Sequence, residues 1–285
     1  MSDRALVTDG IEFPEFFYGT AWKEDQTKRL TELAVRCGFR AIDTANQRRH
    51  YHESAVGQAV SGLIAHGVVG REDLFLQTKF TFQRGQDHRL PYDPGASIPV
   101  QVEQSFASSL KHLGVERVDS YLLHGPAGST GLTSDDWAAW RAMEAIHNSG
   151  RARWIGVSNV TLEQLKCFCQ DAQVQPRTVQ NRCYAVRGWD HDIRDFCRAN
   201  GLAYQAFSLL TANRESLASP EFTKIAARHA RTTSQIAFRF AMDAGMIPLT
   251  GTTNVDHMRA DLDIFKFRLH PAEIEQIEHI RRTIA

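Results

Sequence analysis

Three ionisable side chains and one tyrosine stand where predicted strands end. Asp43, Lys79 and His124 each close a short run of alternating or apolar residues, and Tyr51 lies in the polar, basic loop that follows Asp43. In a barrel of parallel strands the carboxyl ends meet at one mouth, so these four side chains would converge there. Any one of them is explained equally well as a solvated strand end. The four together, in this order, predict a site for proton transfer.

The four residue types complement one another in acid–base chemistry. A tyrosine hydroxyl has an unperturbed pKa of about 10, and a nearby lysine ammonium lowers that pKa by favouring the phenolate. An aspartate beside the lysine keeps the lysine charged and in place, and a neutral histidine can hydrogen-bond a carbonyl oxygen. We therefore expect Tyr51 to act as a general acid tuned by Lys79 and Asp43, while His124 orients the group that receives the proton.

The elements that would hold these residues alternate between strand and helix. Strands are predicted at residues 16–20, 39–45, 74–80, 118–124, 152–159, 178–181, 202–208 and 246–249. Helices are predicted at 25–37, from 53 onward, and at 100–113, 135–148, 162–172, 192–199, 220–244, 255–262 and 271–282, with a break near 231–233. The segment 81–99 is irregular and long enough to indicate a functional loop. Eight alternations without a flexible linker favour one domain over residues 1–285, a single (β/α)8 TIM barrel.

Two further patterns agree with a barrel. At the N-terminus, two short apolar runs flank Asp9-Gly10, a signal for a type I′ turn, so we expect a β-hairpin ahead of the barrel. A doubly wound nucleotide-binding sheet would carry G-x-G-x-x-G after its first strand, whereas residues 18–22 are Y-G-T-A-W. The two-domain alternative is therefore disfavoured.

Composition narrows the class of protein. The 285 residues are 42% hydrophobic and carry 33 basic and 33 acidic side chains, so no net charge draws the chain to nucleic acid or to an anionic membrane. We see neither a signal peptide nor an apolar run that could span a bilayer. The cysteines are odd in number and lack the spacing of a zinc site, which indicates reduced thiols in a cytoplasmic protein without a structural metal. No exposed apolar stripe is evident, so we expect a monomer.

The stretch from Asp43 to Gly57 resembles the active-site opening of the aldo-keto reductase family. There, an aspartate at the end of the second barrel strand is followed by the catalytic tyrosine and then by Glu-x-x-Val-Gly, which is matched here by residues 53–57. The resemblance covers nearly the whole chain. It implies the tetrad Asp43, Tyr51, Lys79 and His124, and the reduction of aldehydes or ketones to alcohols by hydride transfer from NADP(H), with NAD(H) as a possible substitute.

The spacing departs from the family pattern at the tyrosine. The family usually reaches its tyrosine five residues after the aspartate, which here is Arg48, and counting back three from Glu53 gives His50. The interval from Asp43 to Glu53 is two residues longer than usual. We expect this insertion to bulge and to let Tyr51 take the position, because loops tolerate insertions. The alternative is that Tyr51 covers the end of the helix and the site has lost its acid.

The resemblance also assigns residues to the cofactor and the substrate. Ser158, Asn159 and Gln180 match the group that holds the nicotinamide carboxamide, and Phe207, followed by Ser208, matches the ring that stacks on the nicotinamide. The remaining expected cofactor contacts are Gly19, Thr20, Ala21, Asp43, Leu210, Gly251, Thr252, Thr253, His257 and Asp261. The expected substrate pocket contains Trp22, Tyr51 and His124, walled by the loops 81–99 and 125–133.

The loop expected to grip the 2′-phosphate lacks two charges. The family commonly has a lysine where Gly251 stands and an arginine where His257 stands. Arg259 and a protonated His257 could compensate, but the choice between NADP and NAD stays open. Two alternatives to a carbonyl reductase therefore remain. One is an NAD-linked alcohol or sugar dehydrogenase, and the other is a cofactor-binding barrel with little turnover, similar to the channel β-subunits that resemble this family.

Overall fold

The computed structural model describes residues 5–8 and 11–280. Its eight parallel strands form a closed barrel in the order β10-β3-β4-β5-β6-β7-β8-β9, and β1 (Ala5–Thr8) and β2 (Ile11–Pro14) form a separate antiparallel pair. The expected (β/α)8 barrel with an N-terminal hairpin is thereby confirmed, although the turn at Asp9-Gly10 lies outside the described residues. The chain divides into two compact units, a central unit (Tyr18–Val179) and a terminal unit (Met1–Phe17 with Gln180–Ala285).

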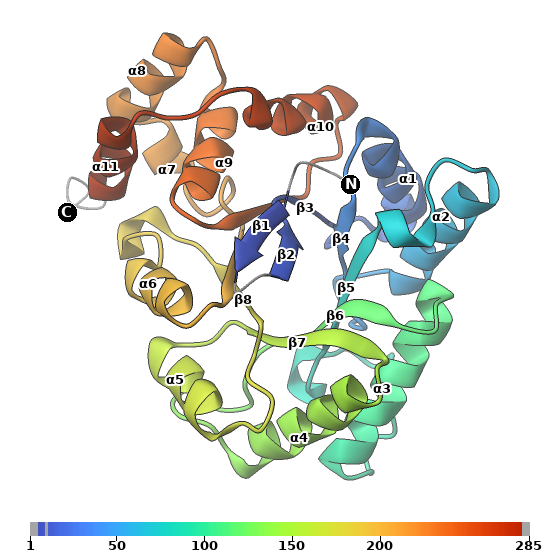
Figure 1. Ribbon diagram of the computed structural model, residues 1–285. Helices are drawn as coiled ribbons and strands as arrows, with labels where there is room; N and C mark the ends of the chain where they lie inside the picture. The colour runs from blue at the N-terminus through green and yellow to red at the C-terminus, as the bar shows by residue number, and fades with distance from the viewer. Residues whose placement is uncertain (1–4, 9–10, 281–285) are drawn as a thin grey trace. The chain divides into compact units, whose positions relative to one another are not determined.

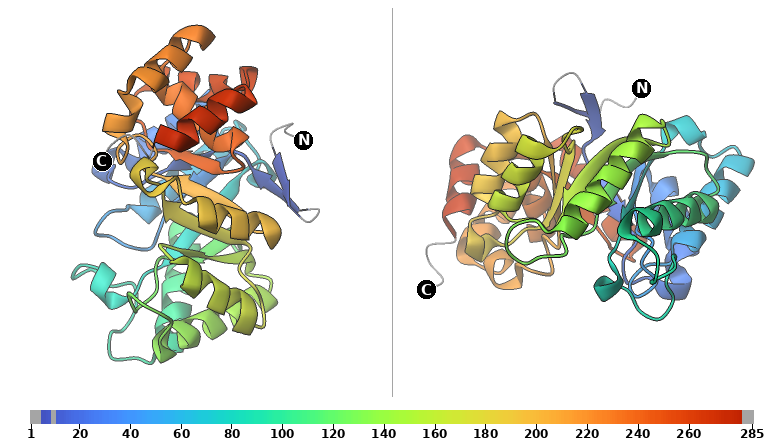
Figure 2. Two further views of the ribbon diagram at one scale, coloured as in Figure 1. Left: turned by 90° about the vertical axis from the view of Figure 1, so that its left-hand side faces the viewer. Right: turned by 90° about the horizontal axis from the view of Figure 1, so that it is seen from below.

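The central unit carries the first barrel strands and the helices that follow them (Figure 1). Its strands are β3 (Phe17–Gly19), β4 (Ala41–Asp43), β5 (Phe75–Phe80), β6 (Val118–Leu123) and β7 (Ala152–Ser158). Its helices are α1 (Thr27–Cys37), α2 (Glu53–Ala65), α3 (Ile98–Leu113), α4 (Ser134–Asn148) and α5 (Leu162–Asp171). Helices α1 to α4 pack side by side in chain order around the strands (Figures 1 and 2).

The core of the central unit follows from strands that are covered on both faces. All six residues of β5 are buried, as is typical of parallel strands between a barrel interior and a layer of helices. The register pairs Asp43 with Gln77, and Lys79 with Leu122. Because side chains alternate along a strand, Gln77 and Lys79 share one face of β5. This register places a lysine just beyond the end of β4.

The terminal unit holds the last strands and a group of helices. The strands are β8 (Thr178–Arg182), which begins in the central unit, β9 (Ala203–Phe207) and β10 (Ile247–Thr250). The helices are α6 (His191–Ala199), α7 (Arg214–Leu217), α8 (Pro220–His229), α9 (Thr233–Asp243), α10 (Val255–Leu262) and α11 (Pro271–His279). Thr232 caps α9 by accepting a hydrogen bond from the backbone amide of Gln235, so the expected break near 231–233 is confirmed.

Differences from the expected elements are local. The four-residue helix α7 was not predicted, because one turn is too short to show a helical period. The long segment after β5 is irregular as expected, apart from a single 3-10 turn at Gln83–Gly85. The helix expected at 25–37 begins as a 3-10 turn at Glu24–Gln26 and becomes α-helical at Thr27.

Gly57 provides a test of the packing between α2 and α3. A Cβ atom at Gly57 would lie 1.9 Å from the carbonyl oxygen of His112 and 2.7 Å from Cα of Leu113. These are backbone atoms that no rotamer change can move, so Gly57→Ala should destabilise the protein by about 2 kcal/mol or more. In Gly62→Ala, on the same helix, the nearest atom would be 3.9 Å away, and the higher helix propensity of alanine should stabilise by about 0.5–1 kcal/mol. Urea unfolding of both variants measures these changes in stability. Equal stability of the two variants would contradict the close contact between Gly57 and the backbone of α3.

Candidate active site

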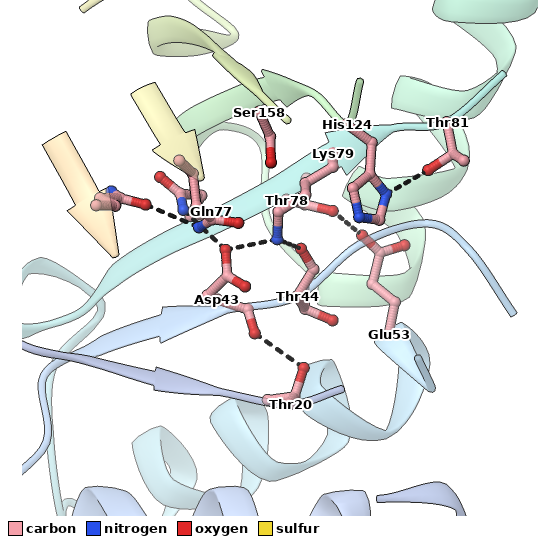
Figure 3. A network of polar contacts seen from close by, with 12 residues as sticks. Thr20, Asp43, Thr44, Glu53, Gln77, Thr78, Lys79, Thr81, His124 and Ser158 are labelled. Carbon is pink, nitrogen blue, oxygen red and sulfur yellow. Dashed lines mark hydrogen bonds and ion pairs between the residues drawn. The ribbon is translucent and has the colours of Figure 1, made fainter. Parts of the chain in front are cut away.

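The centre of the site is a buried ion pair between Lys79 and Asp43. Lys79 Nζ lies 2.6 Å from Oδ1 of Asp43 and donates a second hydrogen bond to the carbonyl oxygen of Thr44 at 2.8 Å. Gln77 donates from Nε2 to the same Asp43 oxygen at 2.7 Å (Figure 3). The side chain of Lys79 has no exposed surface and that of Asp43 is 4% exposed. Burial lowers the pKa of Lys79, while the charge of Asp43 and its hydrogen bond raise it.

Tyr51 reaches this pair through a turn in the loop between β4 and α2. The amides of His50 and Tyr51 both donate to the carbonyl oxygen of Gln47, at 3.2 and 3.0 Å, which coils the chain and absorbs the extra length. The Tyr51 ring then lies 5.3 Å from Lys79 Nζ and edge-on to the His124 ring at 5.9 Å.

The other two residues suggested by residue counting lie elsewhere. His50 packs against Trp22, with ring centroids 4.0 Å apart. Arg48 forms an ion pair with Glu24 at 3.3 Å. Tyr51 is therefore the residue of this loop that the structure brings together with Lys79 and His124.

The expected direction of the Tyr51 pKa is wrong. We expected Lys79 to lower it, whereas burial raises the pKa of Tyr51 and the carboxylate of Asp43 adds to the rise. The physical reason is that Asp43 neutralises Lys79, so the pair offers a phenolate little stabilisation, and a buried phenolate is poorly solvated. In the protein without ligands Tyr51 is a neutral phenol, the form in which it can donate a proton.

His124, directly after β6, is also neutral. Burial and, to a smaller extent, the charge of Lys79 lower the pKa of His124 to about 3. Its Nδ1 lies 2.7 Å from Oγ1 of Thr81, a residue that is 6% exposed (Figure 3). The sequence analysis did not identify Thr81. The only indication was that Thr81 stands two residues after Lys79, just beyond the end of β5. The hydroxyl of Thr81 fixes the orientation of the imidazole.

Glu53 is a second residue whose role in the site was missed. It opens α2, and Thr78 Oγ1 donates to its Oε1 at 2.5 Å while His112 Nδ1 lies 2.9 Å from its Oε2. Thr78 directly precedes Lys79 on β5, so this contact ties the start of α2 to the strand that carries the lysine. The sequence showed Glu53 as the first residue of the Glu-x-x-Val-Gly motif, but it gave no sign of the contacts to Thr78 and His112.

The cofactor residues expected in the central unit surround the ends of β3 and β7. Thr20 is buried, and its amide and hydroxyl both donate to the carbonyl oxygen of Asp43, at 3.0 and 2.9 Å; Gly19 and Ala21 flank it, partly buried. Ser158 ends β7 and is buried, and Figure 3 shows its side chain near Lys79. Asn159 has a left-handed backbone and donates to the carbonyl oxygen of His124 at 2.8 Å.

The expected substrate-pocket residue Trp22 is 70% exposed and also has a left-handed backbone, with φ of 61°. A cavity of about 350 Å³ lies beside the Tyr51 loop. It is lined by Ala45, Asn46, Gln47, Arg48, Tyr51, His52, Glu53, Ser54, Arg89, Leu90, Pro91, Ser108 and His112. The long loop 81–99 thus walls a cavity that Tyr51 lines, whereas Trp22, His124 and the segment 125–133 do not line it.

In the terminal unit, the expected nicotinamide residues lie at the ends of β8 and β9. Gln180 is buried and donates from Nε2 to Oε1 of Gln205 at 2.8 Å. Phe207 ends β9 and is partly buried, and Ser208 follows with a left-handed backbone, with φ of 59°. Leu210 is partly buried. The Phe207 ring therefore keeps part of its surface accessible, as stacking requires.

The loop expected to bind phosphate follows β10. Gly251 and Thr253 are exposed and Thr252 is partly buried. Asn254 caps α10 by accepting from the amides of Asp256 and His257, at 2.7 and 3.1 Å, so two first-turn amides already have a partner.

Arg259, Asp256 and Asp261 of α10 also have partners, whereas the His257 side chain is exposed. Arg259 forms an ion pair with Asp256 at 3.2 Å. Asp261 accepts from Thr250 Oγ1 at 2.7 Å, and burial raises its pKa to about 6. Arg259, which was expected to replace a missing charge, therefore has an acidic partner.

Comparison with known proteins identifies the family. The sequence model of the aldo/keto reductase family matches residues 16–282. The chain belongs to the aldo/keto reductase family. Among its relatives are human aldo-keto reductase family 1 member C1, 28% identical over 98% of this chain and 91% of that protein, and an aldo-keto reductase of Mycolicibacterium smegmatis, 30% identical over 97% and 93%.

Solved structures agree with this assignment. An aldo/keto reductase from Brucella melitensis has a TM-score of 0.80 at 27% identity and covers 97% of this chain and 98% of its own. An aldo-keto reductase complexed with NADPH has a TM-score of 0.81 at 25% identity, and the match covers 97% of this chain and 87% of that chain. Members of the family are oxidoreductases that act on carbonyl groups of small molecules. Within residues 5–8 and 11–280, no helix could span a membrane and no cluster of side chains suits a metal ion.

The neutral state of His124 predicts a pH dependence of stability. The native protein resists protonation of His124 down to about pH 3, whereas the unfolded chain protonates it below about pH 6.5. The contribution of His124 to the free energy of unfolding is fully present above about pH 6.5. It decreases by up to about 1.4 kcal/mol per pH unit as the pH drops toward 3. His124→Gln should remove this part of the acid slope in urea unfolding, and substitution of the exposed His88 by Gln should leave the slope as in wild type. An unchanged slope in His124→Gln would show that His124 protonates in the native state.

The contact between Thr81 and His124 predicts a role in positioning. When the threonine hydroxyl donates to Nδ1, the imidazole proton lies on Nε2, the atom available to a carbonyl oxygen. Thr81→Val keeps the branched shape and removes the hydroxyl, so it should lower kcat about tenfold, leave the affinity for NADPH unchanged and shift the histidine nitrogen resonances in NMR. Thr81→Ser should restore all three. If Thr81→Val has wild-type kcat and resonances, the contact does not set the tautomer.

Proposed function

We propose that the protein reduces small aldehydes or ketones to alcohols with NADPH, and that Tyr51 is the general acid. One observation carries the proposal: in spite of the longer loop, the Tyr51 ring lies against both Lys79 and His124. A vestigial loop in which Tyr51 only covered the start of α2 would not give this arrangement. Four chemically matched side chains, from the ends of three strands and the loop after one of them, therefore support catalysis.

Each residue has a distinct task in this proposal. NADPH, when bound, supplies the hydride, and negative charge develops on the carbonyl oxygen of the substrate. His124 donates a hydrogen bond from Nε2 to that oxygen and orients it, and because the imidazole is neutral it does not compete as a proton source. Tyr51 gives its phenolic proton to the same oxygen. Lys79, held in place by Asp43, faces the ring at 5.3 Å and is the cation beside the phenolate that remains.

The cofactor residues suit a nicotinamide in their chemistry. Ser158, Asn159 and Gln180 provide one hydroxyl and two amide groups at strand ends, a donor and acceptor set that matches a planar carboxamide. NADPH is favoured as cofactor because a relative of the same fold is complexed with it. The absence of fixed charges at Gly251 and His257 favours an NAD-linked dehydrogenase as the second candidate. A cytoplasmic, monomeric, single-domain protein remains our expectation.

Tyr51→Phe tests the proposed acid. Removing one hydroxyl should lower kcat/KM for NADPH-dependent reduction of a panel of reactive aldehydes by about 100-fold or more, while the dissociation constant for NADPH changes little. The measurement is the loss of NADPH absorbance, together with a fluorescence titration of the cofactor. Tyr121→Phe is the matched control, because Tyr121 is a buried tyrosine of the same unit whose ring packs edge-on against Phe106 at 4.7 Å.

The outcomes separate the candidate functions. Equal activity of wild type and Tyr51→Phe would show that another group supplies the proton. If wild type binds NADPH but reduces no aldehyde, the protein is a cofactor-binding barrel rather than a reductase. Faster turnover of alcohols with NAD than of aldehydes with NADPH would favour the dehydrogenase.

A further inference from the structure

Two arginines at the end of β8 share one tyrosine ring. The guanidinium carbon of Arg187 lies 4.9 Å from the ring centroid of Tyr184, and that of Arg182 lies 5.7 Å from it. Arg182 is the last residue of β8, and Arg187 ends the 3-10 turn Ala185–Arg187. Both arginines are exposed and Tyr184 is partly buried.

Neither arginine has an acidic partner among the residues that the structure describes. The chain has as many acidic as basic side chains, so two unpaired guanidiniums on one ring do not follow from an excess of positive charge. Arg151 shows the usual arrangement, because it stacks on Phe106 and also pairs with Glu103. Arg182 and Arg187 stack on Tyr184 in the same way, but neither pairs with a described carboxylate. A guanidinium that has no acidic partner can bind an anion through charge-assisted, paired hydrogen bonds.

The loop that presents these arginines is anchored by buried groups. Asn213 is 3% exposed; its Oδ1 accepts from the amide of Ala185 at 2.7 Å, and its Nδ2 donates to the carbonyl oxygen of Cys183 at 2.9 Å. Trp189 is buried and donates from Nε1 to the carbonyl oxygen of Ile277 at 3.2 Å. The backbone around Tyr184 is thus fixed from both sides.

The same loop contains backbone strain. Trp189 and Asp190 are consecutive left-handed residues that are not glycine, with φ of 55° and 53°. Asp190 is held by Tyr204, whose hydroxyl donates to Oδ2 at 2.7 Å. Strained conformations persist where the surrounding contacts over-determine them, and such sites are concentrated at ligand-binding loops. The arginines therefore stand on a preorganised loop, which reduces the entropy lost on binding.

We propose that Arg182, Tyr184 and Arg187 form a binding site for a phosphate or carboxylate group. Guanidinium groups bind both anions through paired hydrogen bonds, and the tyrosine face keeps the two forks in place. Arg182 stands two residues beyond Gln180 on β8, so the two residues share one face of the strand. The anion therefore belongs to a ligand recognised at this end of β8. The anion could belong to a cofactor phosphate or to an anionic substrate, and that assignment rests on the proposed reductase function. Binding of an anion by the two arginines does not depend on that function.

Titration with inorganic pyrophosphate tests the site directly. Wild type should bind it saturably by calorimetry, and the double variant Arg182→Gln/Arg187→Gln should bind about tenfold more weakly or less. Tyr184→Leu keeps both charges but removes the ring and should also weaken binding. Arg153→Gln is the matched control, because Arg153 is exposed and stacks on Trp154 at 4.3 Å as a single arginine; it should bind as wild type does. Absence of saturable binding, equal weakening in the control, or wild-type binding by Tyr184→Leu would overturn the proposal.

Two further measurements on the double variant identify the source. If a cofactor phosphate occupies the site, the dissociation constant for NADPH rises about tenfold. If a substrate anion does, KM for 4-carboxybenzaldehyde rises and KM for benzaldehyde does not. No change in either quantity would overturn the proposal. If the protein reduces no aldehyde at all, the proposed reductase function fails, while the pyrophosphate and NADPH titrations still decide the anion site.

Discussion

The buried ion pair between Lys79 and Asp43 is the constraint on which the rest of the site depends. Removing two charges from water costs several kcal/mol per ion, and their attraction offsets this only when further hydrogen bonds complete the shell. Gln77 and the carbonyl of Thr44 supply those bonds, and Thr20 fixes the backbone of Asp43 from β3. The ends of three strands are therefore held in position by one ion pair. An apolar core would satisfy the fold equally well, so the pair is best explained by the chemistry around it.

The ion pair sets the charge state of its neighbours. Burial keeps Tyr51 and His124 neutral, and the pair reinforces this, because the charge of Asp43 raises the pKa of Tyr51 and the charge of Lys79 lowers that of His124. A proton that leaves Tyr51 creates a phenolate facing Lys79, and an alkoxide that forms beside His124 takes up the same proton. The proton transfer therefore moves negative charge from the substrate oxygen to Tyr51 and adds no net charge to the site. This explains why a raised pKa of Tyr51 is compatible with its proposed role as an acid.

The sequence predicted the elements better than the contacts between them. The helix at 220–244 was correctly divided because Thr232 is a local capping signal, and the barrel strands were found because their apolar runs are short and continuous. The position of Tyr51 could not be counted from Asp43, because the turn at Gln47 depends on a hydrogen bond from Gln47 Nε2 to the carbonyl of Gly85, far along the chain. The direction of the Tyr51 pKa was wrong because sequence shows which charges are near but not how deeply a hydroxyl is buried. Thr81 was missed for a related reason, since its only signal was its spacing from Lys79.

Backbone strain marks the carboxyl ends of the strands independently of any resemblance to known proteins. Left-handed residues other than glycine follow β3 at Trp22 and Glu24, β7 at Asn159, β8 at Trp189 and Asp190, and β9 at Ser208. A further one, Ala230, follows helix α8. Each such residue destabilises the fold by about 1–2 kcal/mol. The requirements of folding alone give no reason to retain these conformations. Asn159 shows what holds one of them, because its side chain donates to the carbonyl oxygen of His124 and so couples the strained residue to the proposed catalytic histidine. Strain that recurs in the loops after parallel strands indicates that these loops are shaped for binding and catalysis rather than for connecting strands to helices.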